Sequence, residues 1–301
     1  MCHKAVLSVH TGADGLGLEI QNVVDIEKTN NFELVMRFST NINSSDEFFT
    51  DVNGYQLVRR KRFKKLPLQA NYYPIPTMAY IEDRETRLMV ITGSPLGCSS
   101  LYPGQIEVML DRRLNQDDNL GLGQGVLDNH PTKHIFRILL EKVTHACHAT
   151  TENHPAGFPT LSAHVASQTL LNPLVRLLRV EDEDTISNGA YTAVEQEFGV
   201  DFALPTLRLN VYVKGRSHTG FVIYRQFVDV CYADRVLLQQ FPLSEGTVTR
   251  IEETVNISAL LPIDSSKRLH KSSLSFLLVK NEVDGKGNLP LCPMEVQAFV
   301  V

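Results

Sequence analysis

Apolar and polar residues alternate along most of the chain in short runs. Alternation with a period of two places apolar side chains on one face of a strand and polar side chains on the other, which is typical of half-buried antiparallel strands. Glycine, asparagine, aspartate or proline closes most runs, as at Asn53-Gly54 and Asp284-Gly285, where glycine permits the positive φ of a tight turn. The pattern predicts strands at residues 4–10, 16–25, 32–39, 57–61, 87–92, 105–111, 134–143, 208–214, 221–230, 273–280 and 295–301.

Short strands with short connections predict an all-β protein built of stacked antiparallel β-sandwich domains. Residues 161–179 depart from this pattern, because leucines and valines recur at mixed helical spacing and Pro173 interrupts them, which predicts a short helix or a wrapped loop. An acidic, turn-rich passage follows. We therefore predict a first β-sandwich domain over residues 1–180, a linker over 181–205 and a smaller C-terminal β-sandwich unit over 206–301.

The amino-acid composition limits the classes of molecule that we expect the chain to bind. The chain has 301 residues, of which 43% are apolar, so it can bury a substantial core in more than one unit. The net charge is −5 and the basic residues are scattered except at residues 59–65, which argues against nucleic acid as a partner and favours a charged edge strand at that run. No apolar run approaches the roughly 18 residues of a membrane-spanning helix, so we expect no signal or transmembrane segment in this chain.

The cysteines and the N-glycosylation triplets are relevant to the cellular compartment of the protein. The five cysteines are widely spaced and form no Cys-x-x-Cys pair, which excludes a zinc ribbon or a thioredoxin-type site and leaves their redox state open. The triplets that begin at Asn43 and Asn256 satisfy the N-glycosylation sequon. They are compatible with a secretory compartment, although such triplets also arise by chance.

Residues 117–125 form an acidic, glycine-rich segment that is suited to binding a polyol. Gly121, Gly123 and Gly125 lack Cβ atoms, so backbone N–H and C=O groups can approach a ligand directly. The alternative interpretation is a solvated turn between two strands. The spacing of the glycines does not match a dinucleotide-binding fingerprint. Polar side chains that can hydrogen-bond sugar hydroxyls come from Asp117, Asp118, Asn119 and Gln124.

Two other groups of residues could carry chemistry. Glu107 and Asp111 share one face of a predicted strand but lie about 13 Å apart along it, too far for the carboxyl pair of a glycosidase unless a bulge intervenes. His145, Cys147 and His148 include types that bind zinc, but no second pair stands at finger-like spacing, so we interpret them as loop residues.

An ordered series of segments resembles a known family. Residues 66–74 read LPLQANYYP, residues 104–114 read GQIEVMLDRRL and residues 117–129 read DDNLGLGQGVLDN. This series resembles the carboxy-terminal region of Golgi-type class II α-mannosidases, glycoside hydrolase family 38. The resemblance covers most of the chain, most strongly at about residues 49–168, and implies stacked sandwiches of the galactose-mutarotase-like supersandwich type.

The resemblance also implies a function for the parent enzyme. Class II α-mannosidases hydrolyse terminal α-mannose residues of N-linked glycans with retention, and an amino-terminal barrel holds zinc through a His-x-Asp motif and supplies an aspartate nucleophile. No His-x-Asp occurs in this chain. We therefore expect the β-sandwich part of a Golgi-type enzyme with no catalytic residue and no zinc ligand. Its implied partners are a mannose-containing N-glycan and the missing barrel domain, and a homodimer of the parent is a further option.

In the family that the chain resembles, the glycine-rich loop reaches back to the active site, and the position before its first glycine is usually arginine. Here that position is Leu120, which removes five hydrogen-bond donors and a charge. A stand-alone, non-catalytic carbohydrate-binding or interaction module is the alternative function. The resemblance implies substrate contacts from Asp117, Asp118, Leu120, Gly121, Gly123 and Gln124.

Overall fold

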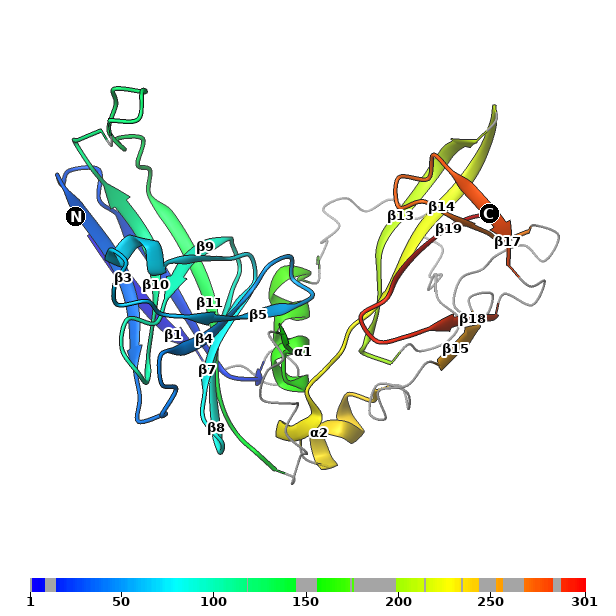
Figure 1. The fold of residues 1–301 in the computed structure, drawn as a ribbon, viewed down its shortest axis with the longest axis horizontal. Coiled ribbons are helices and arrows are strands. Elements are labelled where there is room, and N and C mark those ends of the chain that lie inside the picture. Colours follow the sequence, from blue (N-terminus) through cyan, green and yellow to red (C-terminus); the bar gives the residue numbers. More distant parts are fainter. Residues whose placement is uncertain are drawn as a thin grey trace, which may run out of the picture. The chain divides into compact units, whose positions relative to one another are not determined.

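The computed structural model describes residues 2–8, 15–117, 119–144, 156–173, 175, 199–213, 215–233, 235–243, 253–256, 268–283 and 288–301. The chain divides into two compact units, of which the first comprises Met1–Leu174 with Asp229–Asp234 and the second Val175–Val228 with Arg235–Val301. Antiparallel sheets dominate both units (Figure 1), which confirms the predicted all-β fold class. No helix in the described ranges is long and apolar enough to cross a bilayer.

The first unit is a sandwich of two sheets. The larger sheet has eight strands in the order β1-β2-β11-β8-β7-β4-β5-β12, and the smaller has four in the order β3-β10-β9-β6. The larger sheet contains β1 (Cys2–Ser8), β2 (Leu18–Asp25), β4 (Glu47–Asp51), β5 (Leu57–Lys61), β7 (Met78–Glu82), β8 (Thr86–Thr92), β11 (Thr132–Lys142) and β12 (Ala156–Gly157). The smaller contains β3 (Phe32–Ser39), β6 (Tyr73–Ile75), β9 (Leu96–Ser99) and β10 (Gln105–Arg113).

The larger sheet buries apolar residues on both faces. Leu88 and Val90 of β8 lie in the core between the two sheets, whereas their neighbours Met89 and Ile91 face the opposite side and pack against helix α1 (Leu161–Leu171). Burial on both faces explains why β8 reads as a continuous apolar run instead of an alternating one.

Helix α1 occupies the first part of the range for which the sequence predicted a helix or a wrapped loop. The Thr160 side chain accepts a hydrogen bond from the Ala163 N–H, which caps the first turn. The helix ends at Leu171, before Pro173, whose ring disfavours helical backbone in the residue that precedes it. The helical alternative is therefore confirmed for these eleven residues.

A buried arginine joins three separate parts of the first unit. Arg87, at the start of β8, is only 4% exposed, and its Nε and Nη2 atoms donate to Glu82 at 2.8 and 2.6 Å. Its Nη2 also donates to Asp229 at 2.9 Å, and its Nη1 donates to the carbonyl oxygen of Phe158 at 3.1 Å. The guanidinium carbon lies 4.4 Å from the centre of the Tyr232 ring. These contacts satisfy the buried charge and hold the segment Asp229–Asp234 on the first unit.

The second unit has a five-stranded sheet in the order β13-β14-β19-β16-β17 and a two-stranded sheet of β15 and β18. Arg225 and Asp201 form a fully buried pair at 3.3 Å, and Arg225 Nη1 also donates to the carbonyl oxygen of Leu291 at 2.7 Å. These contacts fix the end of β14 against β18. The elements of this unit are β13 (Phe202–Val213), β14 (Arg216–Arg225), α2 (Arg235–Gln240), β15 (Glu253–Asn256), β16 (His270–Ser272), β17 (Val279–Glu282), β18 (Asn288–Leu291) and β19 (Val296–Val300).

Several sequence predictions match the structure closely. The predicted strands at 32–39 and 57–61 are β3 and β5, with the same bounds. The prediction of a strand at 273–280 is wrong for residues 273–278, which form a turn between β16 and β17 in which Phe276 has a φ of 61°, and correct only for the last two residues, which begin β17. Most of the predicted linker at 181–205 lies outside the described residues, and β13 begins within it, at Phe202. The return of Asp229–Asp234 to the first unit was not predicted.

Replacement of Arg87 by methionine is expected to lower the free energy of unfolding of the first unit by about 3–5 kcal/mol, because two half-buried carboxylates lose the buried charge that balances them. The measurement is the urea midpoint of unfolding, followed by far-ultraviolet circular dichroism. The matched control is Glu47→Gln, which removes a partly exposed ion pair with Arg59 at 3.9 Å and should change the same free energy by less than about 1 kcal/mol. An effect of Arg87→Met no larger than that of the control would contradict the assigned role.

His134 is a buried ionisable side chain that we expect to make the free energy of unfolding depend on pH. His134 on β11 is 5% exposed, and its ring centre lies 6.4 Å from that of Phe136. Neither ring nitrogen makes a hydrogen bond of normal geometry with a residue that the structure describes. Burial lowers the pKa of His134 below its usual value, and the Leu110 backbone and the nearby Asp111 carboxylate oppose this shift without reversing it. The folded protein therefore favours the neutral imidazole.

The free energy of unfolding is expected to fall as the pH drops below about 6.5, because His134 takes up a proton in the unfolded chain at a higher pH than in the folded protein. Urea midpoints between pH 7.5 and 5.5 measure this dependence. His134→Leu should reduce its slope, whereas His130→Gln, at an exposed position, should leave the slope unchanged. Equal slopes in the wild type and in His134→Leu would rule out this origin of the pH dependence.

Candidate functional site

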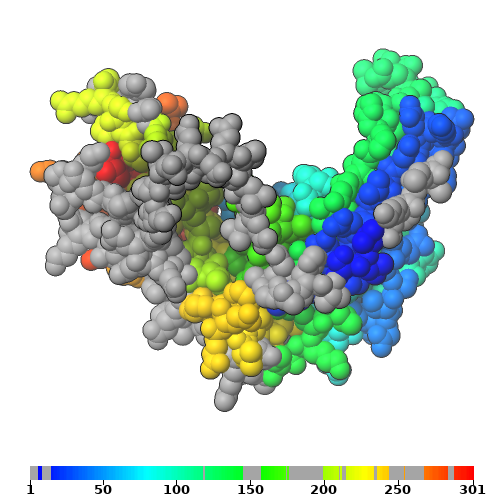
Figure 2. Space-filling view, turned by 180° about the vertical axis from the view of Figure 1, so that it is seen from behind, coloured from blue at the N-terminus to red at the C-terminus, as the bar shows by residue number. Residues whose placement is uncertain are grey.

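The candidate site lies on the segment that joins β10 to β11. A bulge interrupts the pairing of β10 with β3, because Met109 pairs with Val35 but Asp111 pairs with the next residue, Leu34. Beyond the strand, the backbone groups of Leu114 and Val126 form two mutual hydrogen bonds of 3.1 and 2.8 Å. We call residues 114–126 the glycine loop. It stands out beyond the ends of the strands in Figure 1 and in the space-filling view of Figure 2.

Side chains on both flanks hold the base of the glycine loop. The Asn115 N–H donates to the side chain of Asn31 at 2.9 Å. The Asn129 side-chain amide donates to the Asp111 carboxylate and to the Arg112 carbonyl oxygen, both at 2.9 Å, and Arg113 donates to the Asn129 side-chain oxygen at 3.0 Å. The base of the loop is thus fixed by hydrogen bonds from residues that precede and follow it.

Gly125 is part of this base. A Cβ atom at this position would lie 2.2 Å from the carbonyl oxygen of Leu114, so no side chain fits without moving the backbone. The glycine is therefore required for the close approach of the two arms of the loop.

The tip of the glycine loop is open to solvent. Asn119, Gly121 and Gly123 have positive φ values of 60°, 120° and 64°. Added Cβ atoms at Gly121 and Gly123 would meet no atom within 4 Å, so these glycines serve the backbone conformation and not close packing. Leu120 and Leu122 are 85% and 81% exposed.

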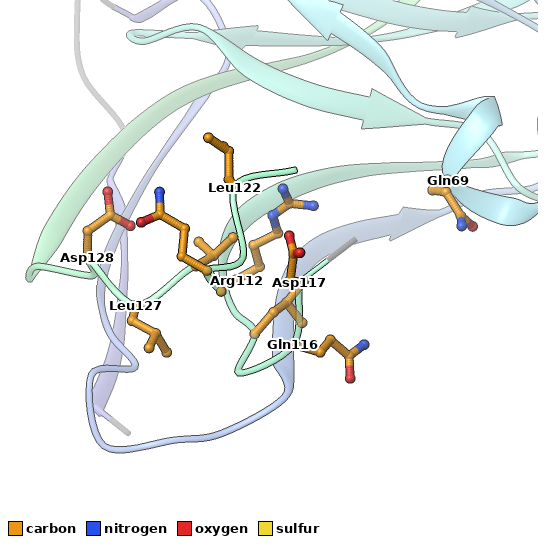
Figure 3. Close-up of a pocket in the computed structure, with 11 residues that line it drawn as sticks. Gln69, Arg112, Gln116, Asp117, Leu122, Leu127 and Asp128 are labelled. Atoms are coloured by element: carbon orange, nitrogen blue, oxygen red, sulfur yellow. The ribbon is translucent and has the colours of Figure 1, made fainter. Parts of the chain in front are cut away.

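A hollow of about 930 Å³ lies beside the loop. Figure 3 shows that its lining comes from the glycine loop and the two residues after it, from the end of β10 and from the 3-10 turn η2 (Leu68–Asn71), which contributes Gln69. We call it the loop hollow. Its polar side chains are two carboxylates, one guanidinium and three amides, which can donate to and accept from sugar hydroxyls. They belong to Gln69, Arg112, Gln116, Asp117, Gln124 and Asp128.

The structure separates the six predicted substrate-binding residues into groups. Asp117 and Gln124 line the loop hollow. Leu120, Gly121 and Gly123 are exposed at the tip and are not part of the lining, and Asp118 lies outside the described residues. The sequence analysis did not single out Gln69, Arg112, Gln116 or Asp128.

Arg112 is notable among the residues that the sequence analysis missed. The sequence has leucine at position 120, where arginine is usual in the family that it resembles, but the loop hollow still contains a guanidinium from the end of β10. The doublet Arg112-Arg113 directly before the loop was the available signal. Gln69 has no local signal, because folding brings it to the hollow from a distant part of the sequence.

Glu107 and Asp111, the carboxylate pair considered in the sequence analysis, have separate partners. Glu107 accepts hydrogen bonds from Arg37 at 2.6 Å and from the Tyr72 hydroxyl, whereas Asp111 accepts from Asn129. Burial, together with the Glu107 carboxylate, raises the pKa of Tyr72. A bulge does intervene between the two carboxylates, but each is held in its own set of contacts, which is typical of structural groups.

The described residues do not fit a zinc site. They bring together no group of three or more histidine, cysteine, aspartate or glutamate side chains that could hold a metal ion. His145, Cys147 and His148 lie outside the described residues. Among the other cysteines, Cys231 is disulfide-bonded, and Cys98 carries a buried thiol.

Two family models match the chain. One is described as the glycosyl hydrolases family 38 C-terminal domain and matches residues 4–120, and the other as the glycosyl hydrolases family 38 C-terminal sub-domain and matches residues 201–301. The chain belongs to the carboxy-terminal region of glycoside hydrolase family 38. The first match includes β10 and the start of the glycine loop, and the second includes all strands of the second unit.

Curated relatives of this family 38 region are α-mannosidases. Alpha-mannosidase 2 of Drosophila melanogaster is 42% identical over 290 residues, which cover 94% of this chain and 24% of the relative. Alpha-mannosidase 2 of Homo sapiens is 34% identical over 304 residues, which cover 99% of this chain and 26% of the relative. The chain thus spans about a quarter of the length of these relatives. The predicted resemblance to the C-terminal region of class II α-mannosidases is confirmed.

A solved structure agrees in fold. An α-mannosidase from Enterococcus faecalis V583 superposes with a TM-score of 0.59 at 10% identity, over 94% of this chain and 27% of that one. At this identity the likeness concerns the family 38 fold alone.

Gly125→Ala is expected to separate the two arms of the glycine loop, because the new Cβ would overlap the carbonyl oxygen of Leu114. Hydrogen exchange of the Leu114 and Val126 amides, which bond to each other's carbonyl groups, measures the effect and should become at least tenfold faster. Leu122→Ser, a change at the exposed tip, is the control and should leave both rates unchanged. Unaltered protection in Gly125→Ala would show that the base is not closed in this way.

Proposed function

We propose that this chain serves as the C-terminal β-sandwich part of a Golgi-type α-mannosidase, which hydrolyses terminal α-mannose residues of N-glycans. The observation that carries the proposal is a projecting loop with a fixed base and a polar hollow, within a chain that belongs to the family 38 C-terminal region. The chain spans about a quarter of its relatives, so the remaining three quarters of such an enzyme would supply the reacting groups.

The chemistry of the described residues supports assigning catalysis to the part of the enzyme outside this chain. Retaining hydrolysis requires two carboxyl groups about 5 Å apart. Glu107 and Asp111 are engaged in separate contacts, and the Asp117 carboxylate lines an open hollow. When bound, zinc would polarise the substrate in the catalytic part of the complete enzyme. The described residues of this chain bring together no set of ligands for it. The isolated chain is thus expected to be inactive.

The loop hollow would contribute hydrogen bonds to the sugar. Arg112 provides donors, Asp117 provides acceptors and Gln124 provides both, which matches the mixed requirements of mannose hydroxyls. At the tip, Gly121 and Gly123 leave the backbone groups of the loop accessible. The family's usual side-chain contact at position 120 would here be replaced by backbone contacts or by Arg112.

The exposed leucines at the tip favour a covering domain. Burial of a leucine side chain stabilises an interface by about 1.5–3 kcal/mol. Leu120 and Leu122 would gain this stabilisation when the catalytic part of the enzyme packs over the loop. The same surface on a free chain would remain in water, which argues against the stand-alone carbohydrate-binding module.

The disulfide at Cys231 supports a secretory location, because structural disulfides form and persist in oxidising compartments. This agrees with the Golgi location that the family resemblance implies. A homodimer of the complete enzyme stays a prediction without support among the described contacts.

A chimera tests the proposal. The C-terminal region of the Drosophila melanogaster relative would be replaced by this chain, and hydrolysis of a chromogenic α-mannoside would be measured with zinc present. The chimera should be active, and the isolated chain should not be. Within the chimera, Asp117→Asn or Gln124→Ala should raise KM about tenfold, because each removes one hydrogen bond to the sugar. The control Asp25→Asn alters a partly exposed carboxylate at the end of β2, outside the hollow, and should have no effect.

Two results would overturn the proposal. Turnover by the isolated chain, abolished by Asp117→Asn, would place the chemistry in this chain. Mannose binding by the isolated chain that is lost in Gly121→Val would favour the stand-alone module instead. Isothermal titration calorimetry distinguishes this second case from simple inactivity.

A further inference from the structure

The loop between β3 and β4 presents a sequon on the surface of the first unit. Residues 41–45 alternate strictly in burial: Ile42 and Ser44 are buried, whereas Asn41, Asn43 and Ser45 are exposed. The alternation places the asparagine of the triplet Asn43-Ser44-Ser45 and its third-position hydroxyl in solvent, while the middle residue is anchored in the protein.

Several hydrogen bonds hold this segment in place. The Gly104 N–H donates to the Ser44 hydroxyl at 3.0 Å, and the Thr40 N–H donates to the Gly104 carbonyl oxygen at 2.9 Å. The Asn43 N–H donates to the Asp83 carboxylate at 3.1 Å, so its backbone is engaged while its side chain is exposed. Backbone hydrogen bonds, first that from Glu85, lower the pKa of Asp83, which keeps this acceptor ionised.

From these observations we propose that Asn43 carries an N-linked glycan in the mature protein. The donor is a lipid pyrophosphate-linked oligosaccharide. A bond forms between Nδ2 of Asn43 and C1 of the first sugar, and the bond from C1 to the pyrophosphate oxygen breaks. The lipid pyrophosphate leaves with the electron pair, and a base of the transferring enzyme takes the amide proton. The side chain that accepts the sugar stands in solvent, so the folded chain accommodates the product.

The glycan and the candidate sugar-binding loop lie at opposite ends of one strand pair. Ser39 pairs with Gln105, and Phe32 pairs with Arg113, the residue directly before the glycine loop. At about 3.4 Å per residue, the eight residues of β3 span about 24 Å between their first and last Cα atoms. A glycan at Asn43 would therefore leave the loop hollow open. The modification concerns the protein itself and depends only on the proposed secretory location, not on mannose binding.

The disulfide at Cys231 independently supports the proposed secretory location of the protein. The second sequon, at Asn256, differs in its surroundings, because Asn256 pairs with Asn288 in the two-stranded sheet and the rest of its triplet lies outside the described residues. The structure therefore favours Asn43 as the acceptor.

The test is translation of the full chain behind a cleavable signal sequence in the presence of endoplasmic-reticulum microsomes. The protease-protected, signal-cleaved product is treated with peptide-N-glycosidase in water that contains heavy oxygen. Mass spectrometry of the tryptic peptide 38–59 should show Asn43 converted to aspartate with one heavy oxygen atom. The same peptide from the untreated product should be largely missing at its unmodified mass.

Matched variants make the assignment specific. Asn43→Gln and Ser45→Ala should each abolish the modification, whereas Ser45→Thr, which preserves the sequon, should retain it. Asn256→Gln should leave the modification at Asn43 unchanged. An unmodified Asn43 in peptide 38–59 of protease-protected wild-type chain would overturn the proposal, and so would retention of the heavy-oxygen label at residue 43 in Ser45→Ala. Mannosidase activity of the chimera is measured separately, so failure of the one proposal can be told from failure of the other.

Discussion

The first unit depends on the compensation of one buried positive charge. Arg87 cannot stay inside the protein without acceptors, and it obtains them from the preceding strand, from Phe158 and from Asp229. Its strand, β8, pairs along most of its length with β11, which begins a few residues after the glycine loop. The satisfaction of this guanidinium therefore fixes the sheet from which the candidate site projects.

The glycine loop combines a fixed base with an accessible tip. Asn31, Asp111 and Asn129 determine where the loop leaves the sheet, and Gly125 lets its two arms approach closely. Leu120 and Leu122 are largely exposed to solvent at the tip. A loop of this kind can contribute to a binding site completed by another domain, because its direction is set before the partner arrives.

Sequence patterns predicted those elements whose burial follows a simple period. The bounds of β3 and β5 were correct, but Phe276 was misread as a strand residue, because a buried apolar side chain can also belong to a turn packed against Val222 and Ala298. Short strands such as β6, with three residues, give too few positions for a period. Asp117 and Gln124, predicted from the sequence as substrate-binding residues, both line the loop hollow, whereas Gln69 could not be predicted, because only the tertiary fold brings η2 there.

The return of Asp229–Asp234 to the first unit has a consequence for biosynthesis. A ribosome completes residues 1–174 well before it reaches Asp229. Arg87 therefore lacks the Asp229 carboxylate until the first segment of the second unit, Val175–Val228, has been synthesised. Domains that are continuous in sequence can fold in turn as they leave the ribosome. Here the first unit reaches its final arrangement only after synthesis of the second unit has begun. Genetic exchange of either unit as one continuous segment would separate Arg87 from Asp229.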